Sequence, residues 1–361
     1  MGEDIKINIS DLRSFMVNVF QKLKVSEEDA KITADVLIAS DRRGIASHGT
    51  ARLRRYVNGI KNGIMIPDAT MKVLKETPVT MLVDGNGGLG QPVSYKTMKR
   101  VITKAKENFI SFAAVKNSNH FGIAGYYSMM ALQENNLIGI STTNSAPLVV
   151  PTNGRNFVYG TNPISFAVPA MNEKPFVLDM ATSTVPRGKL EVYNRAGKEI
   201  PLVWATDETG TPTSNPAKVL KNLLERVGGG LLPLGGAEEL TGGHKGYGLG
   251  VLVDIFTGVL SGGSFGLQVY GKKGKPPDVC HFFGAIRIDA FIPMEEFKKK
   301  MDEFQKMLKN SEKANGKNRI YIHGEKEWEN EDKHIDFVEL SQKVVDDIKN
   351  IGKELSLEIP F

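Results

Sequence analysis

The sequence predicts an α/β protein in which an α/β domain interrupts a mainly helical one. Helical periodicity dominates residues 11–63, and short β-like runs separated by Gly, Pro and Asn turns begin near residue 72. Charged helical sequence returns after residue 292. We therefore expect residues 1–72 and 292–361 to form a helical domain and residues 73–291 to form the inserted α/β domain. A chain of 361 residues is long enough for two cores.

The helices at both chain ends carry recognisable end signals. Ser10 is expected to cap a helix over residues 11–25, and Ser26 a helix that stops at Gly44, with acids in its first turn and arginines in its last. A third helix should end at Gly63. The C-terminal segments with helical character are residues 294–316 and 337–355.

The middle of the chain reads as strands with few intervening helices. Expected strands cover residues 79–84, 110–117, 137–144, 164–169, 176–181 and 281–292. Expected helices cover residues 93–107 and an apolar stretch within 246–263, which suits a buried position in the core or at an interface. Residues 189–243 are polar and rich in turns, and we expect an ordered excursion over the surface.

Composition narrows the classes of protein. The chain is 41% hydrophobic and 24% charged, as is usual for globular proteins, and its apolar runs fall short of the roughly 20 residues of a membrane span. Its first ten residues are polar and acidic, unlike a signal peptide. With Cys280 as its single cysteine, we expect a cytoplasmic protein. Net charge is +5, but the lysines are mixed with acids, so we expect neither nucleic acid nor membrane as a partner.

A glycine motif raises the question of nucleotide binding. Gly85 to Gly90 spell G-x-G-x-x-G between a strand-like run and a helix, the context of a Rossmann turn. Such a turn expects an acid at the tip of the next strand, which here ends in Lys116 and Asn117, and no repeating βαβ units follow. Lys116 could still hold a 2′-phosphate. We favour a structural turn whose glycines adopt positive φ.

Two histidines are candidates for proton transfer. His48, Arg52 and Tyr56 are spaced by four residues and could line one helical face, where an imidazole can move a proton and a guanidinium can grip a carboxylate. His120 follows an expected strand on a turn of small polar residues. The competing interpretations are capping or packing for His48 and a structural turn for His120. The six histidines lack H-x-x-x-H or Cys–His spacing, so no metal is expected, and no G-x-S-x-G indicates a serine hydrolase.

Taken in order, these segments resemble the malate/L-lactate dehydrogenase family, which is unrelated to the Rossmann-type lactate and malate dehydrogenases. The matching segments span nearly the whole chain: "SHGTARLRRY", "DGNGGLGQ", "NSNHFGIAGYY", "YGTNPISFAVP", "LDMATS", "IPLVWATDETGTPT", "LLPLGG", "HKGYGLGVLVDIFTGVLSGG" and "IHGE". The resemblance implies a non-Rossmann NAD(P)-binding domain with a mixed sheet, inserted between N- and C-terminal helical segments. It also implies a homodimer with the site near the subunit boundary.

The resemblance further implies hydride transfer between NAD or NADP and a 2-hydroxy acid/2-keto acid pair, with malate/oxaloacetate or L-lactate/pyruvate as first candidates. It implies His120 as acid/base with His48 assisting, and Arg52 gripping the substrate carboxylate with help from Ser47 and Tyr56. Implied cofactor-binding residues are Asn144, Ser145, Leu178, Asp179, Met180, Ala181, Thr182, Ser183, His244, Lys245, His323, Gly324 and Glu325. At position 244 relatives often carry an aromatic residue instead.

Two alternatives stay open at this point. One is a reductase for another 2-keto acid, such as sulfopyruvate, the ureidoglycolate/oxalurate pair or a sugar keto acid. The other is a catalytically silent metabolite-binding homologue. Retention of His48, Arg52, His120 and Lys245 together argues against the silent homologue.

Overall fold

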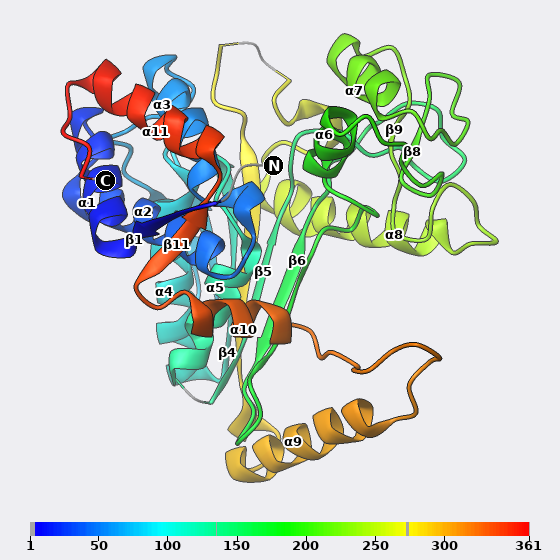
Figure 1. The fold of residues 1–361 in the computed structure, drawn as a ribbon. Helices are drawn as coiled ribbons and strands as arrows, with labels where there is room; N and C mark the ends of the chain where they lie inside the picture. Colours follow the sequence, from blue (N-terminus) through cyan, green and yellow to red (C-terminus); the bar gives the residue numbers. More distant parts are fainter. Residues whose placement is uncertain (1–3, 135, 272–273, 361) are drawn as a thin grey trace.

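A seven-stranded mixed sheet forms the centre of the computed structural model, which describes residues 4–134, 136–271 and 274–360 (Figure 1). Its strand order is β2-β3-β4-β10-β5-β6-β7. The strands are β2 (Lys72–Glu76), β3 (Thr80–Asp84), β4 (Ile110–Ser118), β5 (Leu137–Thr143), β6 (Ile164–Val168), β7 (Phe176–Met180) and β10 (Val279–Arg287). The six strands expected from the sequence are all present; β2 is an addition.

The sheet is almost entirely antiparallel. β3 and β4 form its parallel pair, whereas β10 returns from late in the chain and pairs antiparallel with both β4 and β5. In this register His281 of β10 lies between Val115 of β4 and Thr143 of β5. A Rossmann sheet is built from repeated parallel βαβ units. The expected non-Rossmann α/β fold with a mixed sheet is confirmed.

Helices cover the sheet on both faces. Among the described residues the helices are α1 (Ile9–Lys22), α2 (Glu27–Arg42), α3 (Leu53–Lys61), α4 (Gly90–Asn108), α5 (Ala124–Met130), α6 (Arg187–Arg195), α7 (Pro216–Glu225), α8 (Gly243–Asp254), α9 (Met294–Asn310), α10 (Glu325–Lys333) and α11 (Gln342–Leu355), and α4, α5 and the extension of α8 lie against the sheet. Successive strand side chains point to opposite faces. Phe283 accordingly packs against Tyr127 of α5, while Phe282 packs against Phe256 in the π-helical extension of α8 (Ile255–Val259).

Both ends of the chain share one core. Helices α1, α2, α3 and α11 lie beside a two-stranded ladder of β1 (Ile5–Asn8) and β11 (Phe337–Leu340), as Figure 1 shows. Their apolar side chains pack together in one core. Two sequence expectations were wrong here. Asn8, not Ser10, caps α1 by accepting the Ser10 and Asp11 amides, because the helix begins two residues earlier, at Ile9. Residues 337–340 form a strand instead of helix, because they pair with β1. The exact domain boundaries, 1–72 with 292–361 and 73–291, stay a prediction.

Residues 189–243 form more than a surface excursion. They contribute α6, α7 and the short strands β8 (Ala205–Thr206) and β9 (Gly230–Leu231), and they bury a small core of their own with Val149 and Tyr159. Val219, Leu231 and Leu190 are fully buried in it. The sequence expectation missed this core because its apolar residues are dispersed among turns.

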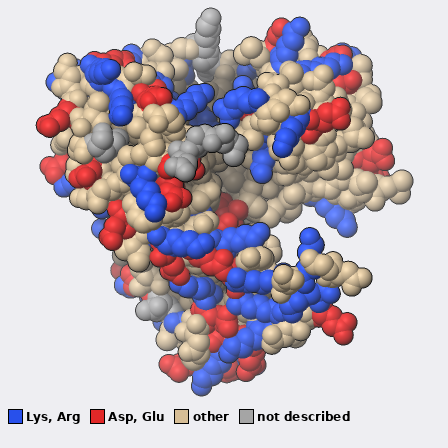
Figure 2. All heavy atoms as spheres, viewed as in Figure 1, with Lys and Arg blue, Asp and Glu red and all other residues tan. Residues whose placement is uncertain are grey.

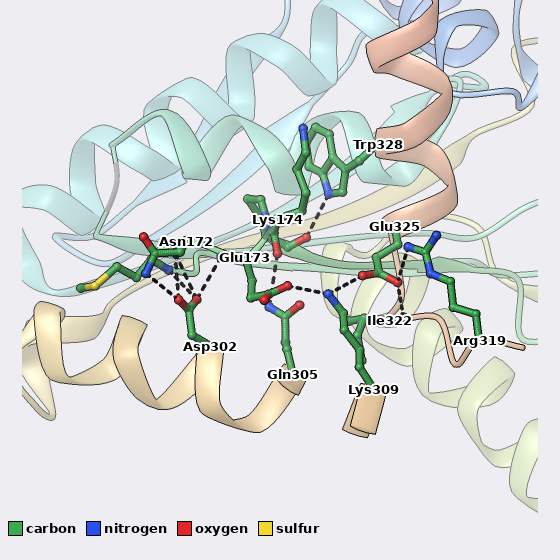
Figure 3. Close-up of polar contacts among 12 residues, drawn as sticks. Asn172, Glu173, Lys174, Asp302, Gln305, Lys309, Arg319, Ile322, Glu325 and Trp328 are labelled. Atoms are coloured by element: carbon green, nitrogen blue, oxygen red, sulfur yellow. Dashed lines mark hydrogen bonds and ion pairs between the residues drawn. The ribbon is translucent and has the colours of Figure 1, made fainter. Parts of the chain in front are cut away.

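Helix α9 attaches to the sheet through polar groups (Figure 3). The Asp302 carboxylate accepts backbone N–H bonds from Met171, Asn172 and Glu173 in the β6–β7 hairpin, and these bonds hold the pKa of Asp302 below its ordinary value despite the opposing effect of burial. Lys309 bridges Glu173 and Glu325. These contacts join three segments far apart in the chain.

The surface carries charges of both signs. Figure 2 shows acidic and basic side chains interspersed on one face and a recess between the part built from α1, α2, α3 and α11 and the part built from α6, α7 and α8. Within the described residues, no helix combines the length and apolarity that a membrane crossing requires.

Candidate active site

The first site segment is the His48 turn, residues 44–52, which follows α2. Gly44 ends that helix with φ +74°, as expected. The buried Asp41 carboxylate then accepts both the backbone N–H of Thr50 (2.7 Å) and its hydroxyl (2.5 Å). A Cβ on Gly49 would stand 1.9 Å from Asp41 Oδ1, so only glycine fits beside this carboxylate. The small residues of "SHGT" therefore serve to seat the turn on Asp41.

The second segment is the His120 turn, residues 117–122, which rests on the glycine motif. The amides of Gly85 and Gly87 donate to the carbonyls of Lys116 and Asn117 (both 2.8 Å), and the Asn119 side chain donates to the carbonyls of Gly87 and Gly88. A Cβ on Gly90 would lie 2.2 Å from the Asn119 carbonyl oxygen. The backbone groups of these glycines thus form hydrogen bonds within the protein, which supports the interpretation of the motif as a structural turn.

The two turns meet at one cavity of about 630 Å³. The His48 and His120 rings stack at 5.5 Å between centroids, and the Tyr56 hydroxyl lies 2.7 Å from Nδ1 of His120. Arg52 lines the same cavity and donates through Nε to the Ser47 carbonyl. The expectation of one helical face was wrong, because Gly49 separates the short 3-10 turn of His48 from α3. Tertiary folding brings these residues together instead.

Burial makes both imidazoles weak bases. It lowers the pKa of His48 from 6.5 to about 4, with Arg52 and Arg55 adding repulsion of the charged form. The pKa of His120 falls well below its ordinary value for the same reasons, burial first and Arg55 second. Burial also raises the pKa of the Tyr56 phenol, so this hydroxyl keeps its proton. Both rings are therefore uncharged at neutral pH when the cavity holds no substrate.

Hydrogen bonds distinguish the two rings. Nδ1 of His120 faces the backbone N–H of Gly122 (3.4 Å), which can only donate, and the protonated Tyr56 hydroxyl. Nδ1 then acts as acceptor, and the neutral ring carries its proton on Nε2. Nδ1 of His48 contacts the Ser47 hydroxyl at 2.9 Å, which can donate or accept. His48 alone of this pair has a free choice of tautomer.

Many of the residues implied for cofactor binding surround this cavity and an adjoining one of about 370 Å³. Asn144, Ser145, Asp179, Met180 and Ala181 line the first. The second shares Asp179 and Met180 with it and adds Leu178, His323 and Gly324. The Asp179 carboxylate accepts the Gly125 amide at 2.7 Å, and burial raises its pKa to about 6. The two cavities adjoin, since Ile45, Asp179 and Met180 line both.

Other implied cofactor residues lie apart from the cavity walls. Thr182 and Ser183 are buried and donate to nearby backbone carbonyls. Glu325 pairs with Lys309 and Arg319 at the start of α10. His244 and Lys245 are exposed in the first turn of α8, outside the lining of both cavities.

Sequence reasoning missed three contributors to the site. Asp41 holds the His48 turn, Arg55 lines the cavity, and His281 lies beneath the His120 turn. The spacing of Arg52 and Arg55 by three residues was a usable signal, because such residues are neighbours on a helix. His281 offered none, since its place depends on where β10 enters the sheet. Across the described chain, no group of three or more His, Cys, Asp or Glu could hold a metal ion.

Comparison with known proteins identifies the family. A family model described as malate/L-lactate dehydrogenase matches residues 7–349. The chain belongs to this family. It is 48% identical to a malate dehydrogenase of Pyrococcus abyssi, over 98% of this chain and 96% of that one. It is 40% identical to a malate/(S)-sulfolactate dehydrogenase of Methanothermus fervidus, over 98% and 99%.

A solved structure agrees with that assignment. Malate dehydrogenase from Entamoeba histolytica superposes with a TM-score of 0.95 at 36% identity, over 99% of this chain and all of that one. This family member is thus a dehydrogenase that acts on a hydroxy acid. The resemblance seen in the sequence is confirmed.

Proposed function

We propose that the protein interconverts a 2-hydroxy acid and its 2-keto acid with NAD or NADP, and that malate/oxaloacetate is the preferred pair, ahead of L-lactate/pyruvate. The observation that carries this proposal is the stacked pair of uncharged imidazoles beside the Arg52 guanidinium in one cavity. An imidazole can take the hydroxyl proton, and a guanidinium can orient the substrate carboxylate. The names of the relatives supply the preference for malate.

The two adjoining cavities suit a dinucleotide. Arg43 and Lys326 line the cavity of about 370 Å³, where cations could hold a diphosphate. Met180 and Ile123 line the cavity of about 630 Å³ and offer apolar walls for a ring. A Cβ on Gly125 would stand 2.7 Å from Asp179 Oδ2, so glycine there lets the Asp179 carboxylate pack against the start of α5. When bound, the nicotinamide would supply or accept the hydride at C2 of the substrate.

The hydrogen bonds support a division of labour between the histidines. With Nδ1–H donated to Ser47, Nε2 of His48 is free to accept the hydroxyl proton. His120, with its proton on Nε2, would instead donate a hydrogen bond to the reacting oxygen. The family resemblance favoured His120 as acid/base with His48 assisting; the hydrogen bonds around the two rings favour the reverse assignment. Arrival of a substrate carboxylate adds negative charge beside both rings and raises their pKa, which readies His48 to hold the proton.

The exposed face of α8 supports a homodimer. Leu252, Ile255, Phe256, Val259 and Leu260 are each at least 40% exposed, and exposed apolar side chains that lie together often mark an interaction surface. The implied subunit boundary would cover it; light scattering at one chain mass would contradict the dimer. Free, buried Cys280 is compatible with the cytoplasmic location that we propose.

The test is turnover with a panel of 2-keto acids: oxaloacetate, pyruvate, sulfopyruvate and a sugar keto acid, each with NADH and NADPH. We expect oxidation of the reduced nicotinamide, followed by absorbance, to be fastest with oxaloacetate. His48→Ala should lower kcat by roughly 100- to 10,000-fold, as loss of an acid/base group does. His120→Ala should lower kcat by less, and both variants should keep nearly full cofactor affinity.

His334→Ala is the matched control, since His334 lies outside both cavities and bonds the Arg42 carbonyl. Absence of turnover with every keto acid would refute the proposed reaction. If kcat falls further in His120→Ala than in His48→Ala, His120 and not His48 is the acid/base group.

A further inference from the structure

The cavity contains a second arginine that the proton and hydride steps leave without a task. Arg55 lines it together with Arg52, and the two are three residues apart where α3 begins. We propose that Arg55 binds a second anionic group of the substrate. The site then selects short acids with an anion at each end, a dicarboxylate or a sulfocarboxylate, over monocarboxylates. This inference rests on the proposed function.

Charge pairing separates these two arginines from their neighbours. Arg54, which lies between Arg52 and Arg55 in sequence, pairs with Asp347 and Glu354 of α11. Arg187, also on the cavity wall, pairs with Glu191 at 3.1 Å. Within the described part of the chain, neither Arg52 nor Arg55 has a carboxylate within ion-pair distance. The nearest acid on the cavity wall, Glu191, acts on Arg52 only from beyond ion-pair distance and is itself paired with Arg187. The cavity therefore presents two half-buried guanidinium groups without a direct ion-pair partner among the described residues.

Each guanidinium is oriented and still has free donors. Nη2 of Arg55 donates to the Tyr270 hydroxyl at 2.7 Å, and Nε of Arg52 donates to the Ser47 carbonyl. Arginine has five N–H donors in a planar fork, so most of each fork remains for a ligand. Residues three apart on a helix have Cβ atoms about 5–6 Å apart. That separation lets two guanidinia hold the two ends of one short molecule.

The positive charge of Arg55 should make binding depend on a second anionic group in the ligand. Arg55 is among the causes that lower the pKa of Arg52, His48 and His120, which means that its charge is felt throughout the cavity. A ligand with one carboxylate leaves one of the two guanidinia uncompensated. A dianion neutralises both, so its binding gains two charge-assisted contacts.

The experiment compares kcat/KM for oxaloacetate, sulfopyruvate and pyruvate in the wild type, Arg55→Met and the control Arg54→Met. Loss of a hydrogen-bonded charge predicts a fall of about 10- to 100-fold for both dianions in Arg55→Met, with pyruvate changed less than about threefold. Arg54→Met should keep the wild-type preference among the three acids. If Arg55→Met does not fold, Arg55→Lys keeps the charge without the fork and should show a smaller loss in the same direction.

An equal loss for all three acids in Arg55→Met, or a wild type without preference for dianions, would overturn the subsite. Measuring oxaloacetate and sulfopyruvate separately shows whether Arg55 prefers a carboxylate or a sulfonate as the second anionic group. Binding of malate and lactate, measured by calorimetry, separates this inference from the reaction itself. Malate affinity that depends on Arg55 without any turnover would uphold the subsite and refute the dehydrogenase proposal; equal affinities for malate and lactate would refute the subsite.

Discussion

The His48 turn and the His120 turn face each other across the cavity, yet different chemistry anchors them. A buried carboxylate, Asp41, holds the first through two hydrogen bonds to Thr50. Uncharged groups hold the second: the glycine-motif backbone, the Asn119 amide and His281, on whose ring Phe121 stacks at 4.7 Å. His281 itself bridges the hydroxyls of Thr143 and Ser118 (2.8 and 2.9 Å). One anchor carries a charge at neutral pH and the other does not.

Because their anchors differ, the two turns should tolerate different kinds of substitution. The His120 turn is packed by backbone against backbone, which cannot move without displacing the strand ends beneath it. The His48 turn is held through side chains, the Asp41 carboxylate and the Ser40 hydroxyl that donates to the Ile45 carbonyl, and a side chain can rotate. The first should therefore be sensitive to added volume and the second to charge and pH.

The largest expected effect is that of added volume. In Gly90→Ala the new Cβ would meet the carbonyl oxygens of Asn119 and His120 at 2.2 and 2.5 Å, and we expect the free energy of unfolding to fall by about 3 kcal/mol or more. Gly49→Ala would meet only the Asp41 carboxylate, whose rotation should cost about 2 kcal/mol in lost hydrogen bonds to Thr50. Denaturant unfolding of both variants measures this order. A Gly49→Ala variant less stable than Gly90→Ala would break the comparison.

Next in size is the pH dependence of stability. Burial raises the pKa of Asp41 from 3.8 to about 6, so its stabilisation is complete below about pH 4 and is lost as pH rises through 6. Burial lowers the pKa of His281 from 6.5 to about 3, so stability rises with pH between 3 and 6.5. The two anchors give opposite slopes in the same window, each by up to about 3 kcal/mol.

Asp41→Asn and His281→Gln each remove one slope. Between pH 4 and 6.5, the loss of stability caused by Asp41→Asn should shrink as pH rises, and the loss caused by His281→Gln should grow. Urea unfolding at several pH values gives both. Parallel trends in the two variants would show that the anchors do not differ in charge.

The smallest effect concerns the direct partners of the rings. Tyr56→Phe removes the hydroxyl from Nδ1 of His120 but leaves the Gly122 amide, so the tautomer should persist and kcat should fall only about 5- to 10-fold, the value of one hydrogen bond. Ser47→Ala removes the hydroxyl that contacts His48 Nδ1 and should lower kcat by more. The dependence of kcat on pH separates the two variants further. The apparent pKa of the imidazole that transfers the proton should shift more in Ser47→Ala than in Tyr56→Phe.

Local sequence determined much of the scaffold. Ser26 accepts the Asp29 amide at the start of α2, and Gly44 with positive φ ends that helix, because caps and left-handed turns depend on residues within a few positions. Where tertiary pairing was involved, local signals failed. Residues 337–340 have helical neighbours but join β1, and Asn8 displaced Ser10 as the cap of α1.

The sequence by itself determined the segments that carry the chemistry: the histidine turns, the arginines of α3, the strands and the glycine motif, together with the family resemblance. The folded chain was needed to see that His48 and His120, 72 positions apart, stack over one cavity, that Asp41 and His281 lie under them, and that the glycine motif supports the His120 turn. The physical reason is that helix ends and strands depend on neighbouring residues, whereas burial, and the pKa values that follow from it, depends on which distant segments the sheet brings together.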